Sequence, residues 1–160
     1  MAEPLADQIL RQAQQASELY FRLVLVVGAA GSGKTVALQE VQSRMAAPLV
    51  NVNLELSRRM LDMTERQRAL QVAKLLEEIA GQVGHDVVLL DNIEILFDVS
   101  LKQDPLRLLQ GISRNRTVVA TWNGALENGL VTYATPGHPE HQRYAVHDFL
   151  VVPSEAVTGV

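Results

Sequence analysis

The chain has 160 residues, a formal net charge of −4, 48% hydrophobic residues, 4% aromatic residues and no cysteine. This length suits one domain with an aliphatic core, and the lack of cysteine excludes disulfide bonds and cysteine-ligated metal. The acidic balance provides no overall basic field for nucleic acid, and no apolar segment reaches the roughly 20 residues that span a bilayer. We therefore expect a single cytoplasmic domain over residues 1–160, without a signal peptide or a membrane partner.

The predicted elements alternate between helices and strands. Residues 1–21 carry apolar side chains at three- and four-residue steps, which predicts an N-terminal amphipathic helix. The apolar run 23–27 is typical of a strand buried on both faces, and a helix is expected over 33–46. Residues 49–54 alternate apolar and polar side chains and predict a second strand. Later helices are expected over 64–81 and 105–112, and later strands over 87–91, 117–121 and 149–152.

This alternation predicts βαβ units, and hence an α/β fold with three layers around a mostly parallel, five-stranded sheet. Residues 124–147 are rich in glycine, proline, threonine and histidine. They are expected to form a loop with a short strand or helical turn, and 139–142 looks helical. Residues 154–160 are expected to be a flexible tail.

The segment Gly28–Thr35 matches the phosphate-binding (Walker A) pattern G-x-x-x-x-G-K-[ST] at every fixed position. It stands between a predicted buried strand and a predicted helix, which is the context that the pattern requires, whereas a chance glycine-rich turn would lack it. Converging backbone N–H groups and a helix N-terminus suit a triphosphate, and the lysine adds a full charge. We expect ATP phosphates at Gly28, Ala29, Ala30, Gly31, Ser32, Gly33, Lys34 and Thr35.

A triphosphate site also needs an acid that helps to hold Mg²⁺, and Asp91 is the candidate. Asp91 ends the apolar run 87–90, and ligands of open α/β sheets bind at the carboxyl ends of strands. We expect Asp91 to anchor Mg²⁺ through the water shell of the metal, while the Thr35 hydroxyl is a direct ligand. The alternative is that Asp91 caps the next helix. The expected cofactors are therefore ATP and Mg²⁺.

The residue after Asp91 bears on hydrolysis. Many ATPases of this type have a glutamate there to polarise the attacking water, whereas this chain has Asn92. An amide can align a water molecule but cannot accept its proton. Glu94 is either a substitute for that glutamate or an acid in the first turn of a helix. We therefore expect ATP binding with slow or partner-dependent hydrolysis.

Two more polar residues are candidates for the site. Asn123 follows the fourth predicted strand and would lie between the phosphate loop and Asp91, with Thr121 as the second candidate. The pair 123–124 is also an Asn-Gly sequence, which favours a plain turn. Arg143 precedes the last strand and is either an arginine that acts in trans on a neighbouring subunit or an exposed side chain without a role.

The order of these parts resembles the additional-strand P-loop ATPases, and the AAA+ class in particular. The resemblance lies in the phosphate loop, the strand that ends at Asp91, the sensor-like Asn123 and Arg143 before the last strand. It implies an ATPase fold of the P-loop NTPase kind. Asn92 departs from the acidic pair that is usual in the class.

A closer resemblance is to the small stand-alone P-loop proteins of bacteriophage-exclusion (BREX) defence systems. It rests on the phosphate loop together with residues 50–57 (VNVNLELS), 89–94 (LLDNIE) and 137–140 (GHPE). This resemblance implies a role in bacterial anti-phage defence, alongside larger ATPase, methyltransferase and phosphatase-like components of the system.

Three functions stay open at this point. The first is an ATP-binding switch or assembly subunit that associates with itself or with other defence-system proteins. The second is a small-molecule kinase, whose acceptor site would use Asn53 or Glu55 and whose lid would use arginines. The third is a nucleotide-regulated adaptor that binds DNA. The arginines concerned are Arg107, Arg114 and Arg116 for the lid, and Arg58, Arg59 and Arg66 for DNA.

Overall fold

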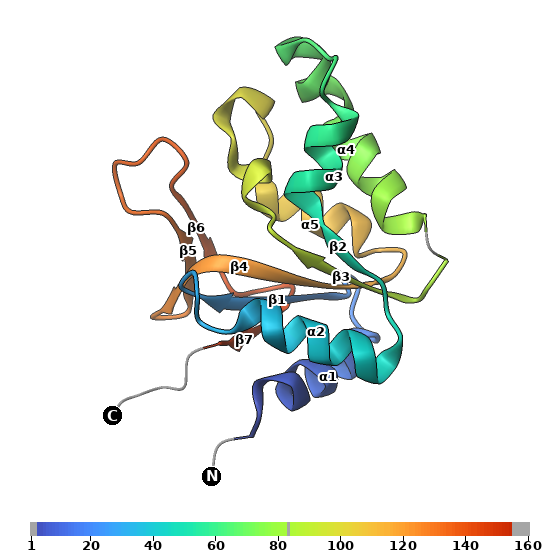
Figure 1. The fold of residues 1–160 in the computed structure, drawn as a ribbon. Helices are drawn as coiled ribbons and strands as arrows, with labels where there is room; N and C mark the ends of the chain where they lie inside the picture. The colour runs from blue at the N-terminus through green and yellow to red at the C-terminus, as the bar shows by residue number, and fades with distance from the viewer. Residues whose placement is uncertain (1–2, 83, 155–160) are drawn as a thin grey trace.

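A five-stranded parallel sheet, in the order β2-β3-β4-β1-β7, lies between two layers of helices in a computed structural model that describes residues 3–82 and 84–154 (Figure 1). The predicted three-layer fold with a mostly parallel sheet is confirmed. The helices are α1 (Leu5–Ala16), α2 (Lys34–Met45), α3 (Val52–Arg59), α4 (Glu65–Gly81) and α5 (Pro105–Ile112), with the short 3-10 helices η1 (Glu94–Phe97) and η2 (Val99–Leu101). The strands are β1 (Leu23–Gly28), β2 (Leu49–Asn51), β3 (Val87–Asp91), β4 (Thr117–Glu127), β5 (Leu130–Tyr133), β6 (Gln142–Ala145) and β7 (Leu150–Pro153).

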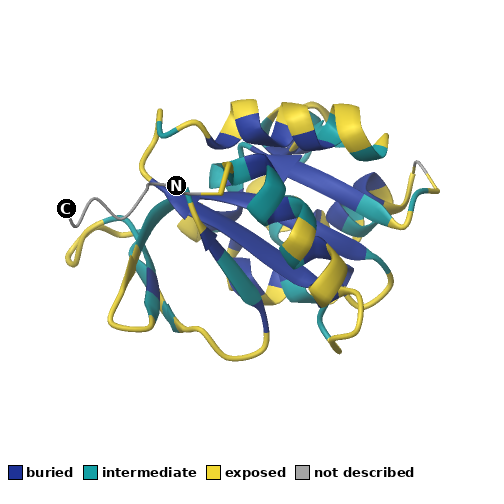
Figure 2. Ribbon diagram, turned by 90° about the horizontal axis from the view of Figure 1, so that it is seen from below, coloured by how far each residue is buried: buried dark blue, intermediate teal, exposed yellow. Residues whose placement is uncertain are grey.

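Strand β1 is the centre of the fold and is buried at every position. It pairs in parallel with β4 on one side and β7 on the other. Alternate side chains of β1 face opposite layers, so Val24 and Val26 pack with α1 and α2, while Leu25 and Val27 pack with α3, α4 and α5. Figure 2 shows these central strands as buried and the outer helix faces as exposed. A strand covered on both faces has to be apolar throughout, as the sequence indicated.

The predicted N-terminal helix is too long at its C-terminal end. It ends at Ala16, and Tyr20, which lies within the predicted helix, is 67% exposed. The guanidinium of Arg114 lies 5.0 Å from the centre of the Tyr20 ring. The expected flexible tail falls almost entirely on residues 155–160, which lie outside the described residues.

The second predicted strand is also too long. β2 ends at Asn51, whose side chain accepts a hydrogen bond from the backbone N–H of Leu54 and so caps α3. Asparagine is a preferred N-cap residue because it satisfies a free N–H of the first turn. The alternation over 49–54 therefore spans a strand end and a helix start, with Val52 buried in the first turn.

Residues 124–147 contain more strand than the predicted loop with one short strand or helical turn, and only 134–141 form a longer loop. β4 runs on to Glu127, β5 pairs with it, and β6 pairs with β5. Asn123-Gly124 lies inside β4, and the two-residue turn is at Asn128-Gly129, where φ is 53° and 77°. Positive φ at both positions is typical of the hairpin turns that Asn-Gly favours. The expected helical segment at 139–142 is absent, since it is a turn followed by the start of β6.

Gly124 permits the close approach of β4 and β5. A Cβ atom at this position would lie 1.8 Å from the carbonyl oxygen of Thr132, which also accepts a hydrogen bond from the Trp122 indole. We therefore expect Gly124→Ala to displace β5 and to lower the free energy of unfolding by about 1–3 kcal/mol in urea titrations. Gly111→Ala is the matched control: nothing lies within 4 Å of its added Cβ, so this helical change should be neutral or stabilising. Equal effects of the two changes would contradict this account.

Over residues 3–82 and 84–154, no helix combines the length and the apolar character that crossing a membrane requires.

Candidate nucleotide-binding site

The phosphate loop connects β1 to α2, so it lies at the carboxyl edge of the sheet next to the ends of β4 and β7. Gly31 and Gly33 have φ of 80° and 91°, in the left-handed region that glycine adopts without strain. Gly28 packs against the end of β7, where a Cβ would lie 1.7 Å from the Ser154 hydroxyl oxygen. The backbone of the loop thus has the bends that its glycines predict.

Lys34 is buried in the loop, with 5% of its surface exposed. Its ammonium donates to the carbonyl oxygens of Gly28 (2.9 Å) and Ala29 (2.6 Å), and to the Ser32 hydroxyl (3.4 Å). The Ser32 hydroxyl is also hydrogen-bonded to the hydroxyl of Ser154, at 2.6 Å. These contacts hold one positive charge inside the loop at the N-terminus of α2, where a phosphate would be attracted.

Asp91 lies beside the first turn of α2, as the motif requires. Its carboxylate accepts hydrogen bonds from the hydroxyls of Thr35 and Thr121, both at 2.7 Å, and from the backbone N–H of Asn92 at 3.0 Å. Only 7% of Asp91 is exposed. The structure therefore brings Thr35 and Asp91 together, and it places Thr121, the second candidate on β4, in direct contact with the same acid.

These oxygens fit Mg²⁺. Magnesium in nucleotide sites takes one or two protein oxygens and completes its shell with phosphate oxygens and water. The adjacent Thr35 hydroxyl and Asp91 carboxylate are such a pair. Within the described part of the chain there is no cluster of three or more acidic, histidine or cysteine residues that could hold a metal ion by themselves.

Glu94 supplies a carboxylate to the site, whereas Asn92, the residue directly after Asp91, can supply only an amide. Asn92 has φ of 53°, which turns the chain sharply after β3 and starts η1 at Glu94. The two carboxylate oxygens of Glu94 then accept hydrogen bonds from the side-chain amides of Asn53 (3.1 Å) and Asn123 (3.0 Å). Glu94 is therefore oriented by residues from two other elements, α3 and β4.

Asn53 is the residue that the sequence analysis missed for this role. The side-chain oxygen of Asn53 accepts a hydrogen bond from the backbone N–H of Ile95 (2.7 Å). The backbone N–H of Asn53 donates to the backbone carbonyl of Asn92 (2.8 Å). It thus fixes both the turn after β3 and the Glu94 carboxylate. The only sequence signal would have been a polar residue after β2, combined with the knowledge that β2 lies beside β3.

Most of the predicted site residues line one cavity of about 330 Å³. It is lined by Ala30, Gly31, Gly33, Lys34, Thr35, Val36, Asp91, Asn92, Glu94 and Asn123. Arg143 is not among them. It is an exposed residue of β6 that lines an adjoining cavity of about 610 Å³, together with Ala29, Ala30 and Asn123.

The residues proposed for a kinase or a DNA adaptor are not gathered at this cavity. Arg114 and Arg116 precede β4 and so lie at its amino end, away from the phosphate loop. Arg116 donates to Glu77 at 2.6 Å, and Arg59 donates to Glu55 at 2.6 Å. Arg58 is also within 3.5 Å of Glu55.

An aromatic cluster supports the site from the core side of β4 and β5. Phe97 stacks on Tyr133 with ring centres 3.6 Å apart, and Trp122 packs edge-on against both.

Burial raises the pKa of Tyr133 to about 12, and the negative charges of Glu94 and Glu140 add to the effect. Burial, followed by the hydrogen bond to Asp104, also raises the pKa of Tyr144. Both phenols therefore stay protonated at neutral pH, and Tyr144 donates to Asp104.

The strand order, the phosphate loop at the end of β1 and the acid at the end of β3 define a P-loop NTPase. A family model described as "ATPase family associated with various cellular activities (AAA)" matches residues 24–121. The chain belongs to this family. The AAA+-like fold implied by the sequence resemblance is thus shown, and membership of this family indicates nucleotide binding.

Two solved structures are similar over most of this chain. The structure of C. elegans PCH-2 has a TM-score of 0.45 and 17% identity, covering 93% of this chain and 41% of that one. The structure of Drosophila ORC bound to DNA has a TM-score of 0.47 and 16% identity, covering 92% of this chain and 41% of that one. The chain therefore spans less than half the length of either structure's chain. No curated protein sequence matches it.

Proposed function

We propose that this AAA-family chain is an ATP- and Mg²⁺-binding switch or assembly subunit whose hydrolysis is slow or depends on a partner. The observation that carries the proposal is the position of Glu94. This carboxylate reaches the cavity that also contains Lys34 and Asp91, but it is held there by Asn53 and Asn123. Binding groups and a candidate base are therefore present, and the base is already engaged by two amides.

The chemistry assigned to each residue follows from these contacts. The amide groups of the loop and Lys34 would bind the phosphates, and Thr35 and Asp91 would hold Mg²⁺, which neutralises charge on the phosphate oxygens. Glu94 would accept the proton of the attacking water. An amide donates to each of its carboxylate oxygens, so that water can use only the remaining acceptor position on each oxygen. Asn92 could align the water but not deprotonate it.

This arrangement supports a switch. Asn123 lines the nucleotide cavity, so a phosphate bound there could also accept a hydrogen bond from the amide that holds Glu94 and shift it. Asn53 belongs to α3, so a change at Glu94 is transmitted to the layer of helices above the sheet (Figure 1). Ordering or release of such loops by a γ-phosphate is a common way to report nucleotide state.

The cellular role is the finer part of the proposal. We propose that the chain acts in the bacterial cytoplasm in anti-phage defence, through self-association or contacts with other defence-system proteins. The support is the resemblance to BREX proteins over the phosphate loop and residues 50–57, 89–94 and 137–140. Residues 50–57 run from β2 into α3 and include Asn53, so the resemblance covers part of the candidate site.

Sedimentation velocity with and without Mg·ATP tests the switch. We expect a larger sedimentation coefficient with Mg·ATP, and a turnover per chain that rises with protein concentration if the activating partner is a second copy. Identical sedimentation in both conditions, together with turnover that is independent of concentration, would refute self-association as the response to nucleotide.

A further inference from the structure

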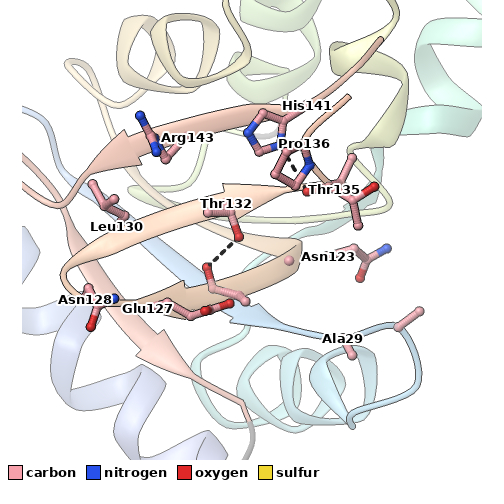
Figure 3. A pocket seen from close by; sticks show the side chains of 14 residues that line it. Ala29, Asn123, Glu127, Asn128, Leu130, Thr132, Thr135, Pro136, His141 and Arg143 are labelled. Atoms are coloured by element: carbon pink, nitrogen blue, oxygen red, sulfur yellow. Dashed lines mark hydrogen bonds between the residues drawn. The ribbon is translucent and has the colours of Figure 1, made fainter. Parts of the chain in front are cut away.

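A second cavity adjoins the nucleotide cavity. It has a volume of about 610 Å³ and lies between the phosphate loop, at Ala29 and Ala30, and the strands β4 to β6, at Thr132 and Arg143 (Figure 3). We call it the side pocket. Ala30 and Asn123 line both cavities, so the two adjoin at these residues. A volume of this size is in the range of small-molecule sites.

The side pocket is a consequence of the strand alternation in the antiparallel extension. Ala125, Thr132 and Arg143 form one cross-strand row and face the pocket. The alternate residues face the core, where Val131 and Trp122 are fully buried. Small side chains on the pocket face leave the volume open, because neither alanine nor threonine can fill it.

The side chains of Arg143 and Glu127 both line the pocket, and of these two Arg143 is the group that suits an anion with an apolar body. Arg143 is exposed and its side chain makes no ion pair or hydrogen bond within the described part of the chain. A guanidinium of this kind matches the two oxygens of a carboxylate or phosphate. Leu130 and Pro136 add apolar surface, and the Nδ1 atom of His141 is bonded to the carbonyl of Ala134 at 3.1 Å, which orients the ring.

The position of the pocket links it to the nucleotide. Asn123 donates to Glu94 at 3.0 Å and lines the side pocket at the same time. A ligand in the side pocket would therefore lie beside Asn123, the residue whose amide holds the Glu94 carboxylate.

We infer that the side pocket binds a small organic anion, a carboxylate or a phosphate monoester, through Arg143, and that Asn123 couples this binding to that of the nucleotide. The coupling rests on the proposed ATP binding, whereas the anion site does not. Coupling between two sites is reciprocal, so the anion should change nucleotide affinity by the same factor as the nucleotide changes anion affinity.

Ligand-observed NMR and calorimetry with phenyl phosphate, benzoate and neutral benzyl alcohol test the anion site. The phosphate loop is first filled with Mg²⁺ and a non-hydrolysable ATP analogue, so that phenyl phosphate cannot bind there. We expect both anions to bind, benzyl alcohol to bind about tenfold more weakly or not at all, and Arg143→Ala to weaken the anions by about tenfold. Arg107→Ala, a change at an exposed arginine of α5, is the matched control and should have no effect.

Two results would overturn the inference: absence of anion binding, or binding that is unchanged in Arg143→Ala. If the ATP analogue itself does not bind, the proposed function fails. The anion site is then measured in Lys34→Ala with benzoate and benzyl alcohol, so the two failures are distinguishable.

For the coupling, we expect the affinity for the ATP analogue to shift on addition of benzoate in the native chain and not in Asn123→Ala. An equal shift in both, or no shift in either, would refute the role of Asn123.

Discussion

Replacement of Lys34 by alanine should abolish measurable ATP binding. The Lys34 ammonium is buried in the phosphate loop and bonded to two loop carbonyls, so its charge is already placed where the phosphates would lie. Hydrogen bonds to charged groups contribute about 1.5–3 kcal/mol each, and a buried cation between phosphates makes more than one. We therefore expect a loss of at least about a hundredfold in affinity by titration calorimetry.

The matched control is Lys74→Ala, which removes an exposed lysine from the middle of α4. Its ATP affinity should equal that of the native chain. Circular dichroism and urea unfolding should show that Lys34→Ala still folds, since the loop glycines and the Ser32–Ser154 hydrogen bond are retained. An ATP affinity that is unchanged in Lys34→Ala would refute the phosphate site.

Replacement of Glu94 by glutamine should stop turnover while ATP binding is retained. A positioned general base contributes about 10²- to 10⁴-fold to a rate, and glutamine cannot accept the proton. The loop, Lys34 and Asp91 are untouched by the change. We expect kcat for phosphate release to fall by at least about a hundredfold, with the ATP dissociation constant changed only slightly.

Two further variants identify the base. Glu78→Gln removes an exposed acid from α4 and should leave turnover unchanged. Asn92→Gly keeps the left-handed backbone but removes the amide, so turnover should fall only a few-fold if that amide merely aligns the water. A variant series in which Asn92→Gly is inactive and Glu94→Gln is active would reverse the assignment.

Where the local signals agreed with one another, the sequence predicted the elements well. The helix over 64–81 begins with a capping box in which the side chains of Thr64 and Gln67 each bond the backbone of the other. The helix over 105–112 has Asp104 as N-cap and Pro105 in its first position. Caps act within one turn, so they can be read from neighbouring residues.

The errors arose where two local signals competed. Alternation over 49–54 predicted a strand, but the N-cap at Asn51 starts a helix within it. Asn-Gly at 123–124 left a turn open as an alternative to a site residue, but the turn is at the second Asn-Gly, at 128–129, so β4 and β5 pair as a hairpin. Gly124 instead serves close packing, a contact that depends on a strand partner and has no local signature.

The sequence by itself determined the phosphate loop, because that site is a continuous segment whose backbone conformation depends on its own glycines and on the strand and helix that flank it. Only the tertiary structure decided that Glu94 meets Asn53 and Asn123, and that Arg143 lines a pocket beside the loop of its own chain. The physical reason is the order of the strands. β2, β3 and β4 become neighbours through crossover connections, so side chains that are up to 70 residues apart (Asn53 and Asn123) meet at one edge of the sheet.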